Sequence, residues 1–131
     1  MWYDNTLLKK FKGNHKKIKK ALVAVIKNSK RKYLQSPSLL IKINPVVESI
    51  RHINKDVIFS KNVLNELRKF DSETSVNCFF VENAPGQGEK GVMGRARYPM
   101  PCPKSNINQY GNIRQATNIF AHELGHNLDM T

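Results

Sequence analysis

The apolar residues in the first third of the chain predict a long amphipathic helix over residues 14–33. They recur at intervals of three and four, which places them on one face of a helix: Ile18, Ala21, Leu22, Val25 and Ile26. Gly13 and Asn14 precede them and predict a chain break followed by an N-cap. Basic residues occupy the rest of the circumference, so the predicted helix buries one side and exposes a cationic one.

Between this helix and the end of the chain, short β-favouring runs predict strands over 39–43, 56–59, 76–81 and 91–98. A helix capped by Ser60 is predicted over 60–70. The prolines at positions 99, 101 and 103 cannot continue a strand because each lacks a ladder donor. A long connection is therefore predicted to run to Asn112.

A final helix is predicted from about Ile113 to Asn127 or Leu128. Its apolar residues Ala116, Phe120 and Leu124 share a face, and His122 and His126 lie on an adjoining one. Because strands and helices alternate along the sequence, the chain is predicted to belong to the α/β or α+β class.

Length and composition indicate a single domain that can bury a real core, with 131 residues of which 40% are hydrophobic. No run of 18 apolar residues occurs, so no membrane span is predicted. The first residues do not resemble a secretory signal peptide. The only cysteines, Cys78 and Cys102, do not form a CxxC pair, which argues against a zinc knuckle or a thioredoxin-like site. They could form one disulfide, or each could pair elsewhere.

Positive charge is concentrated at the N-terminal end of the chain. Residues 1–42 contain 12 Lys and Arg against a single acid, Asp4, whereas the remainder contains 10 against 9. Such a block is either the solvated face of a helix or a contact surface for a polyanion.

The last ten residues contain the candidate chemistry, in the segment His122-Glu123-Leu124-Gly125-His126. The two histidines are four residues apart, so on a helix they share one face about 6 Å apart along the axis. Neutral imidazoles at this spacing can bind one Zn²⁺, and the glutamate beside the first can act as a general base on water. The alternative is a pair of surface histidines near a helix end, where their charged form suits the helix dipole.

The segment from Ala121 to Leu128 resembles the active-site helix of the metzincin metalloproteases, in particular the adamalysin (reprolysin) branch, which includes the ADAM, ADAMTS and snake-venom enzymes. The resemblance implies a zincin fold with a mixed twisted sheet, a long N-terminal helix over 14–33, a second strand over 39–43 and an edge strand over 91–98. It also implies that His122 and His126 are zinc ligands and that Glu123 is the catalytic base.

In that family the motif continues through a glycine to a third histidine. Here the glycine position is Asp129, and the third histidine would fall one residue beyond Thr131. Aspartate tolerates the sharp exit from the helix that the family's glycine provides. The alternative role of Asp129 as replacement ligand conflicts with geometry, because it would lie roughly 7–8 Å along the axis from the metal. The first strand and the C-terminal subdomain of the family are also expected to be missing, so residues 1–131 would be a partial, incomplete or inactive catalytic domain.

The resemblance further implies a secreted or extracellular zinc metalloendopeptidase that acts on proteins or peptides, with no nucleic acid partner. Its substrate would lie extended along the edge strand, against Gly91, Val92, Met93 and Gly94. The alternative for the two glycines is turn or bulge chemistry. In relatives a cysteine near Cys102 bonds with one past the active-site helix, which would leave Cys102 unpaired here.

A hypothesis of a different class comes from the charge distribution alone. The chain would then be a non-catalytic module whose basic helix binds a heparin-like polyanion or a nucleic acid.

Overall fold

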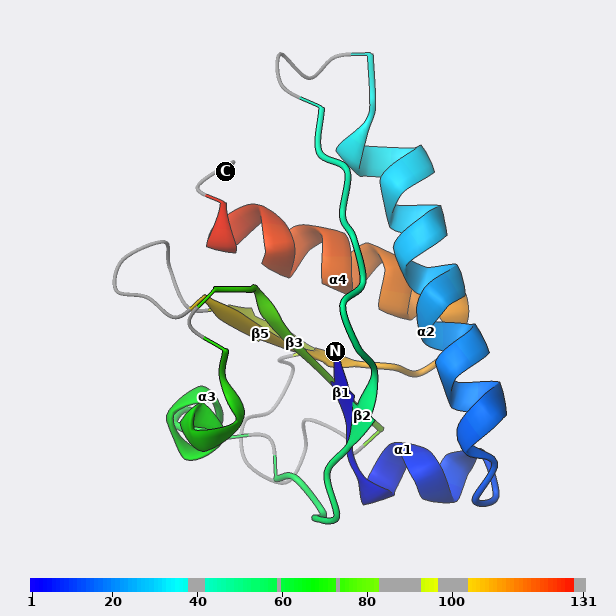
Figure 1. Cartoon of the computed structure of the whole chain (residues 1–131), viewed down its shortest axis with the longest axis vertical. Coiled ribbons are helices and arrows are strands. Elements are labelled where there is room, and N and C mark those ends of the chain that lie inside the picture. Colours follow the sequence, from blue (N-terminus) through cyan, green and yellow to red (C-terminus); the bar gives the residue numbers. More distant parts are fainter. Residues whose placement is uncertain (38–41, 59, 73, 83–92, 97–103, 129–131) are drawn as a thin grey trace.

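The chain forms a five-stranded sheet with helices on both faces (Figure 1). The computed structural model describes residues 1–37, 42–58, 60–72, 74–82, 93–96 and 104–128. The strands are β1 (Trp2–Tyr3), β2 (Arg51–His52), β3 (Asn77–Val81), β4 (Gly94–Ala96) and β5 (Ser105–Gln109), in the spatial order β2-β1-β3-β5-β4. All neighbours are parallel except β4, which runs antiparallel to β5. The predicted mixed α/β class is confirmed.

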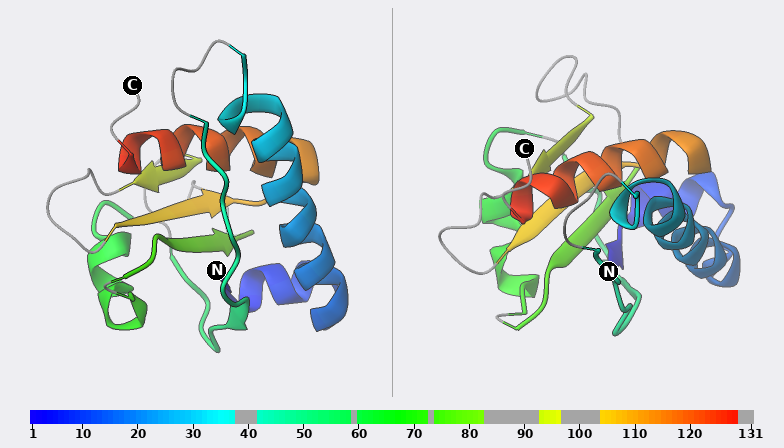
Figure 2. Two further views of the ribbon diagram at one scale, coloured as in Figure 1. Left: turned by 45° about the horizontal axis from the view of Figure 1, so that its top comes forward. Right: turned by 90° about the horizontal axis from the view of Figure 1, so that it is seen from above.

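Four α-helices flank the sheet in the described residues: α1 (Asn5–Lys10), α2 (His15–Ser29), α3 (Val63–Glu66) and α4 (Ile113–Asn127). A π-helical turn, Lys30–Leu34, extends α2, and a 3₁₀ turn, Arg68–Phe70, follows α3. Helices α2 and α4 cover one face of the sheet and α3 lies on the other (Figure 2). None of the described helices is long and apolar enough to cross a membrane.

Strand β3 is buried along its whole length, which explains its continuous apolar run. Because side chains alternate across a strand, Cys78 and Phe80 contribute to the core beneath α2 and α4. Phe79 and Val81 contribute to the second core, beneath α3. The strand predicted over 76–81 is thus confirmed as β3. It contributes side chains to the apolar cores on both faces of the sheet.

The two long helices follow the periodicity of their apolar residues. Asn14 caps α2 as predicted, since its side-chain oxygen accepts a hydrogen bond from the Lys17 amide at 3.1 Å. The five predicted core residues of α2 are all buried. Helix α4 also has the predicted bounds and begins at an Asn112 cap, whose side chain accepts from the Gln115 amide at 2.8 Å.

Two predictions about the strands are wrong. The segment predicted as a connection to Asn112 contains β5, which lies inside the sheet between β3 and β4. The sequence does not predict this strand because asparagine is rare in strands. The first strand, expected to be missing, is present as β1, which lies between β2 and β3 in the sheet.

Other boundaries differ for local physical reasons. Of the strand predicted over 39–43, residues 38–41 lie outside the described part, and 42–43 are not in a strand; β2 forms later, at Arg51–His52. Residues 56–58 of the next predicted strand are also irregular, because the Val57 amide donates to the Asp4 carboxylate at 3.0 Å rather than to a sheet neighbour. The helix predicted over 60–70 is divided into α3 and the 3₁₀ turn, in a stretch with two poor helix formers, Asn62 and Asn65.

A cluster of rings joins β1, β2 and the start of α2. The Tyr3 hydroxyl lies 2.6 Å from His15 Nδ1, and the rings of Tyr3 and His52 stack at 5.3 Å. His52 Nε2 lies 2.7 Å from the side-chain oxygen of Asn5 and donates its proton there. Burial, and secondarily the charge of His15, lowers the pKa of His52, while Asp4 acts in the opposite direction.

This lowered pKa predicts a loss of stability in mild acid. Because the unfolded chain binds a proton at His52 near pH 6.5 and the folded chain does so only at lower pH, the free energy of unfolding falls as pH drops through this interval. Denaturant titrations between pH 7.5 and 5 should show this slope in the natural chain and a flatter profile in His52→Gln. Identical profiles for both proteins would contradict the assignment.

Candidate metal centre

Helix α4 carries the candidate site across one face of the sheet, next to β5 and β4 (Figures 1 and 2). Its apolar side, formed by Ala116, Phe120 and Leu124, is buried in the core shared with α2. This packing fixes the rotation of the helix about its axis. As a result, Glu123 is directed inward, and His122 remains exposed.

The structure brings the two predicted ligands together. Nε2 of His122 lies 3.0 Å from Nε2 of His126, and the rings meet edge to face with centroids 4.6 Å apart. Two nitrogens bound to one tetrahedral zinc at about 2.0–2.1 Å would be roughly 3.3 Å apart. The observed separation is slightly shorter than this value and also fits a hydrogen bond between the two imidazoles. Nitrogen donors of this kind suit zinc.

A third ligand is not part of this arrangement. Among the residues that the structure describes, no group of three or more His, Cys, Asp or Glu side chains could hold a metal ion. Asp129, considered above as a turn residue or replacement ligand, lies outside the described residues. The described residues thus offer two candidate ligands and one candidate base.

Glu123 is buried although it is ionisable, with only 7% of its surface exposed. Burial raises the pKa of this carboxyl, whereas the neighbouring His122 and Arg95 act in the opposite direction. Arg95 belongs to β4, so the edge strand adds a positive charge to the surroundings of the candidate base. The sequence pattern alone does not reveal this contribution from Arg95.

Gly94 of β4 allows the edge strand to approach α4 closely. A Cβ atom built on this glycine would lie 2.8 Å from both Glu123 Cγ and Ile119 Cγ2, and 2.9 Å from Glu123 Oε1. Contacts this short are not tolerated between packed atoms, so any side chain here would displace the candidate base. Gly94 therefore has a packing role beside Glu123, and its predicted contact with substrate stays a prediction.

The predicted edge strand is confirmed where it is described. Within the described residues, β4 pairs only with β5, which leaves its other side free of strand neighbours. Met93 precedes it, has 46% of its surface exposed, and accepts a hydrogen bond from the Gln109 amide through its carbonyl at 2.9 Å. Gly91 and Val92, the other two predicted substrate contacts, lie outside the described residues.

A buried amide network holds the end of α4 against β5. Asn106 Nδ2 donates to Asn127 Oδ1 at 2.8 Å, and Asn127 Nδ2 donates to the Ser105 carbonyl at 2.9 Å. Asn108 Nδ2 donates in turn to Asn106 Oδ1 at 2.8 Å. All three asparagine side chains are fully buried. Asn127 directly follows His126, so the network fixes the helix at one of the two candidate ligands.

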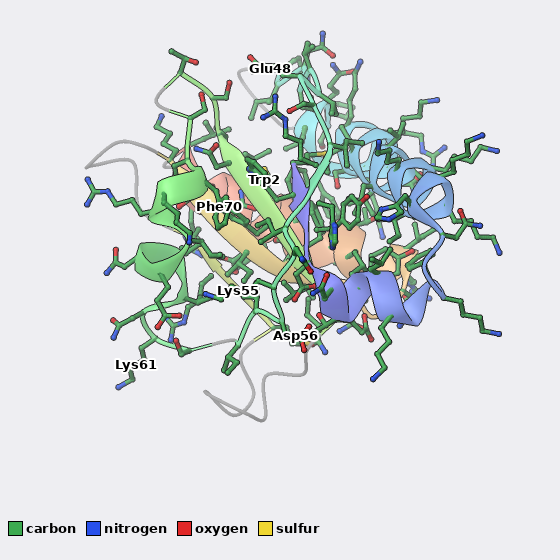
Figure 3. All side chains as sticks on the ribbon, turned by 60° about the horizontal axis from the view of Figure 1, so that its bottom comes forward. Trp2, Glu48, Lys55, Asp56, Lys61 and Phe70 are labelled. Carbon is green, nitrogen blue, oxygen red and sulfur yellow. The ribbon has the colours of Figure 1, made fainter. Side chains whose placement is uncertain are left out.

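Two other features lie apart from the histidines. Cys78 is a free, buried thiol beside Asn106, and burial raises its pKa to about 11. It also lines a cavity of about 750 Å³, which is bordered by Trp2, Glu48 and Phe70 (labelled in Figure 3) and by the core side of α4. None of the three motif residues lines this cavity.

Comparison of the sequence with protein-family models and with curated proteins finds no match.

Two glycine substitutions test the geometry around Glu123. Gly94→Ala should lower the free energy of unfolding by about 1–3 kcal/mol, because the added methyl group overpacks the contact between β4 and α4. Gly125→Ala is the matched control, since its Cβ would meet nothing within 4 Å. It should stabilise the chain by about 0.5–1 kcal/mol through helix propensity. Urea denaturation measures both, and equal effects of the two substitutions would contradict the close approach.

Proposed function

We propose that the chain is the zinc-binding part of a metalloendopeptidase domain of the adamalysin type. The observation that carries the proposal is the 3.0 Å separation of the His122 and His126 Nε2 atoms beside the buried Glu123. A candidate ligand pair, a candidate base and a strand edge that has no strand neighbour among the described residues occur together at one place on the molecule. A pair of surface histidines would not require the other two features.

The order of elements along the chain supports the same proposal. The family resemblance implies a strand, a long helix, a second strand, an edge strand beside the cleft and an active-site helix. Strand β1, helix α2, strand β2, strand β4 and helix α4 follow this order. The antiparallel β4 lies at the edge of the sheet and contacts α4 at Glu123.

In this proposal His122 and His126 hold the metal through their Nε2 atoms. Zinc, when bound, supplies a Lewis acid for the scissile carbonyl and lowers the pKa of water. Glu123 accepts the proton of the attacking water and returns it to the leaving amine. The family resemblance places the third histidine immediately after Thr131.

The substrate would be an extended segment of a protein or peptide. The backbone groups on the free side of β4 can pair with such a segment as with an added strand, which holds the peptide parallel to the sheet. Because α4 lies against β4 at Gly94, this mode of binding places the peptide next to Glu123. A secreted location remains part of the proposal.

Zinc titration with removal of each ligand tests the metal site. We expect one zinc per chain, and we expect the affinity to fall more than about 100-fold in His122→Ala or His126→Ala, since even outer-shell changes cost about 10–100-fold. His15→Ala is the matched control and should bind as the natural chain does. Zinc binding that persists unchanged in His122→Ala would refute the site.

A second measurement separates metal binding from catalysis. Adding one histidine after Thr131 should tighten zinc binding and permit hydrolysis of an unfolded protein substrate, because catalytic zinc sites use three protein ligands. In that extended chain, Glu123→Gln should retain zinc and abolish hydrolysis. Equal hydrolysis with Gln at position 123 would exclude the proposed base.

A further inference from the structure

A stripe of cations runs along the solvent side of α2 and its π-helical extension. We call it the basic stripe; it consists of Lys16, Lys19, Lys20, Lys27, Lys30 and Arg31. At about 100° per residue these positions fall within roughly a third of the helix circumference and extend over about 22 Å. Figure 3 shows side chains with nitrogen tips that project from α2 into solvent. The cations therefore form a band along the length of the exposed side of α2.

The basic stripe has no acidic partner in the part of the chain that the structure describes. The only ion pair described there joins Lys10 to Glu82, and neither residue belongs to the stripe. Asp4, the single acid among residues 1–42, has 1% of its surface exposed, and its carboxylate accepts from the amides of Leu7 and Val57. It is therefore engaged inside the fold and leaves the positive field of the stripe uncompensated.

Folding of α2 does not explain these charges. Lysines in the first turn oppose the helix dipole, and no acidic residue balances them there. The pairs Lys16–Lys20 and Lys27–Arg31 place like charges four residues apart, which destabilises a helix. The apolar face of α2 packs in the core, and none of the stripe residues belongs to that face. Lys27, Lys30 and Arg31 lie near the C-terminal end, where cations suit the helix dipole. The N-terminal lysines and the like-charged pairs still oppose the helix, which points to a role outside the chain.

We propose that the basic stripe binds a linear sulfated polysaccharide of the heparin type. A band of cations that extends over about 22 Å along one side of a helix matches an extended polyanion whose charges repeat along its length. Five of the six cations are lysines, which act as point charges and do not impose the planar geometry of arginine. A partner recognised through charge density fits this composition best.

The surroundings of the stripe argue against the two other common polyanions. Single-stranded nucleic acids are bound by interleaved exposed aromatic rings, but the stripe has only Tyr33 at its end, and the hydroxyl of Tyr33 donates to Asn118 at 2.6 Å. An interfacial helix inserts its apolar face into lipid, whereas the apolar face of α2 is buried in the core.

The polysaccharide would not cover the histidines. Helix α2 meets α4 through its buried side, where the Ser29 hydroxyl donates to the Thr117 carbonyl at 3.3 Å. The basic stripe lies on the opposite side of α2. Binding at the stripe is therefore independent of the proposed peptidase function and can be tested in a chain that binds no metal.

The test compares two triple variants that remove the same charge from different places. Lys16, Lys20 and Lys27 are changed to Gln in the first variant, and the exposed Lys55, Lys61 and Lys69 are changed to Gln in the second. Figure 3 places Lys55 and Lys61 away from α2. Affinity for an immobilised heparin dodecasaccharide is measured over a range of salt concentrations. We expect the first variant to lose at least about tenfold in affinity and about two units of the log–log salt slope, with little change in the second.

Three further measurements separate loss of the binding site from loss of the fold. Changing Lys16, Lys20 and Lys27 to Arg should retain binding, and far-UV circular dichroism should show that the Gln variant keeps its helices, because Gln is a good helix former. His122→Ala should bind the dodecasaccharide as the natural chain does. Equal losses in the two Gln variants would overturn the proposal, as would tighter binding to single-stranded DNA or to phosphatidylserine vesicles than to the saccharide.

Discussion

The close packing of α4 against β4 and β5 is the constraint on which the candidate site depends. At one point Gly94 lets the edge strand approach Glu123 so closely that a methyl group cannot fit between them. Further along, Asn127 binds Asn106 and the Ser105 carbonyl of β5. These contacts fix the helix both at the candidate base and beside the second histidine. The geometry of the two imidazoles is thus set by the sheet as well as by the helix repeat.

Both faces of the sheet are covered by apolar cores, and the end of α4 adds a polar contact. Beneath α3, Ile107 packs with Phe79 and Val81 in an apolar layer. Beneath the end of α4, the contact is made by amides, which must be hydrogen-bonded because buried polar groups otherwise destabilise a fold. Hydrogen bonds are directional, whereas apolar contacts tolerate small shifts. The directional contacts lie beside the candidate site, where a catalytic role would require precise positions.

Much of this arrangement is local in sequence and could be predicted. The apolar residues from Ile18 to Ile26 recur with the helical period and predict α2. The continuous apolar run that ends at Val81 predicts β3. His122 and His126 are neighbours because a helix brings residues i and i+4 together, which requires no knowledge of the fold. The role of Gly94 and the network around Asn106 could not be predicted, because both depend on residues far apart in sequence. Strand β5 could not be predicted for the same reason. Its asparagines are accommodated in the sheet because Asn106 donates to the distant Asn127 and Asn108 donates to Asn106.

The asparagines of β5 also discriminate between alternative alignments of the sheet. Asn106 and Asn108 face α4, and Ile107 between them faces the apolar layer under α3. Sliding β5 by one residue would exchange these faces, place two amides among apolar side chains and leave Asn127 without its partner. Because β4 is aligned on β5, with Gly94 opposite Asn108, the same slip would move Gly94 away from Glu123. A strand with little apolar character thereby selects the single alignment in which the edge strand and the candidate base meet.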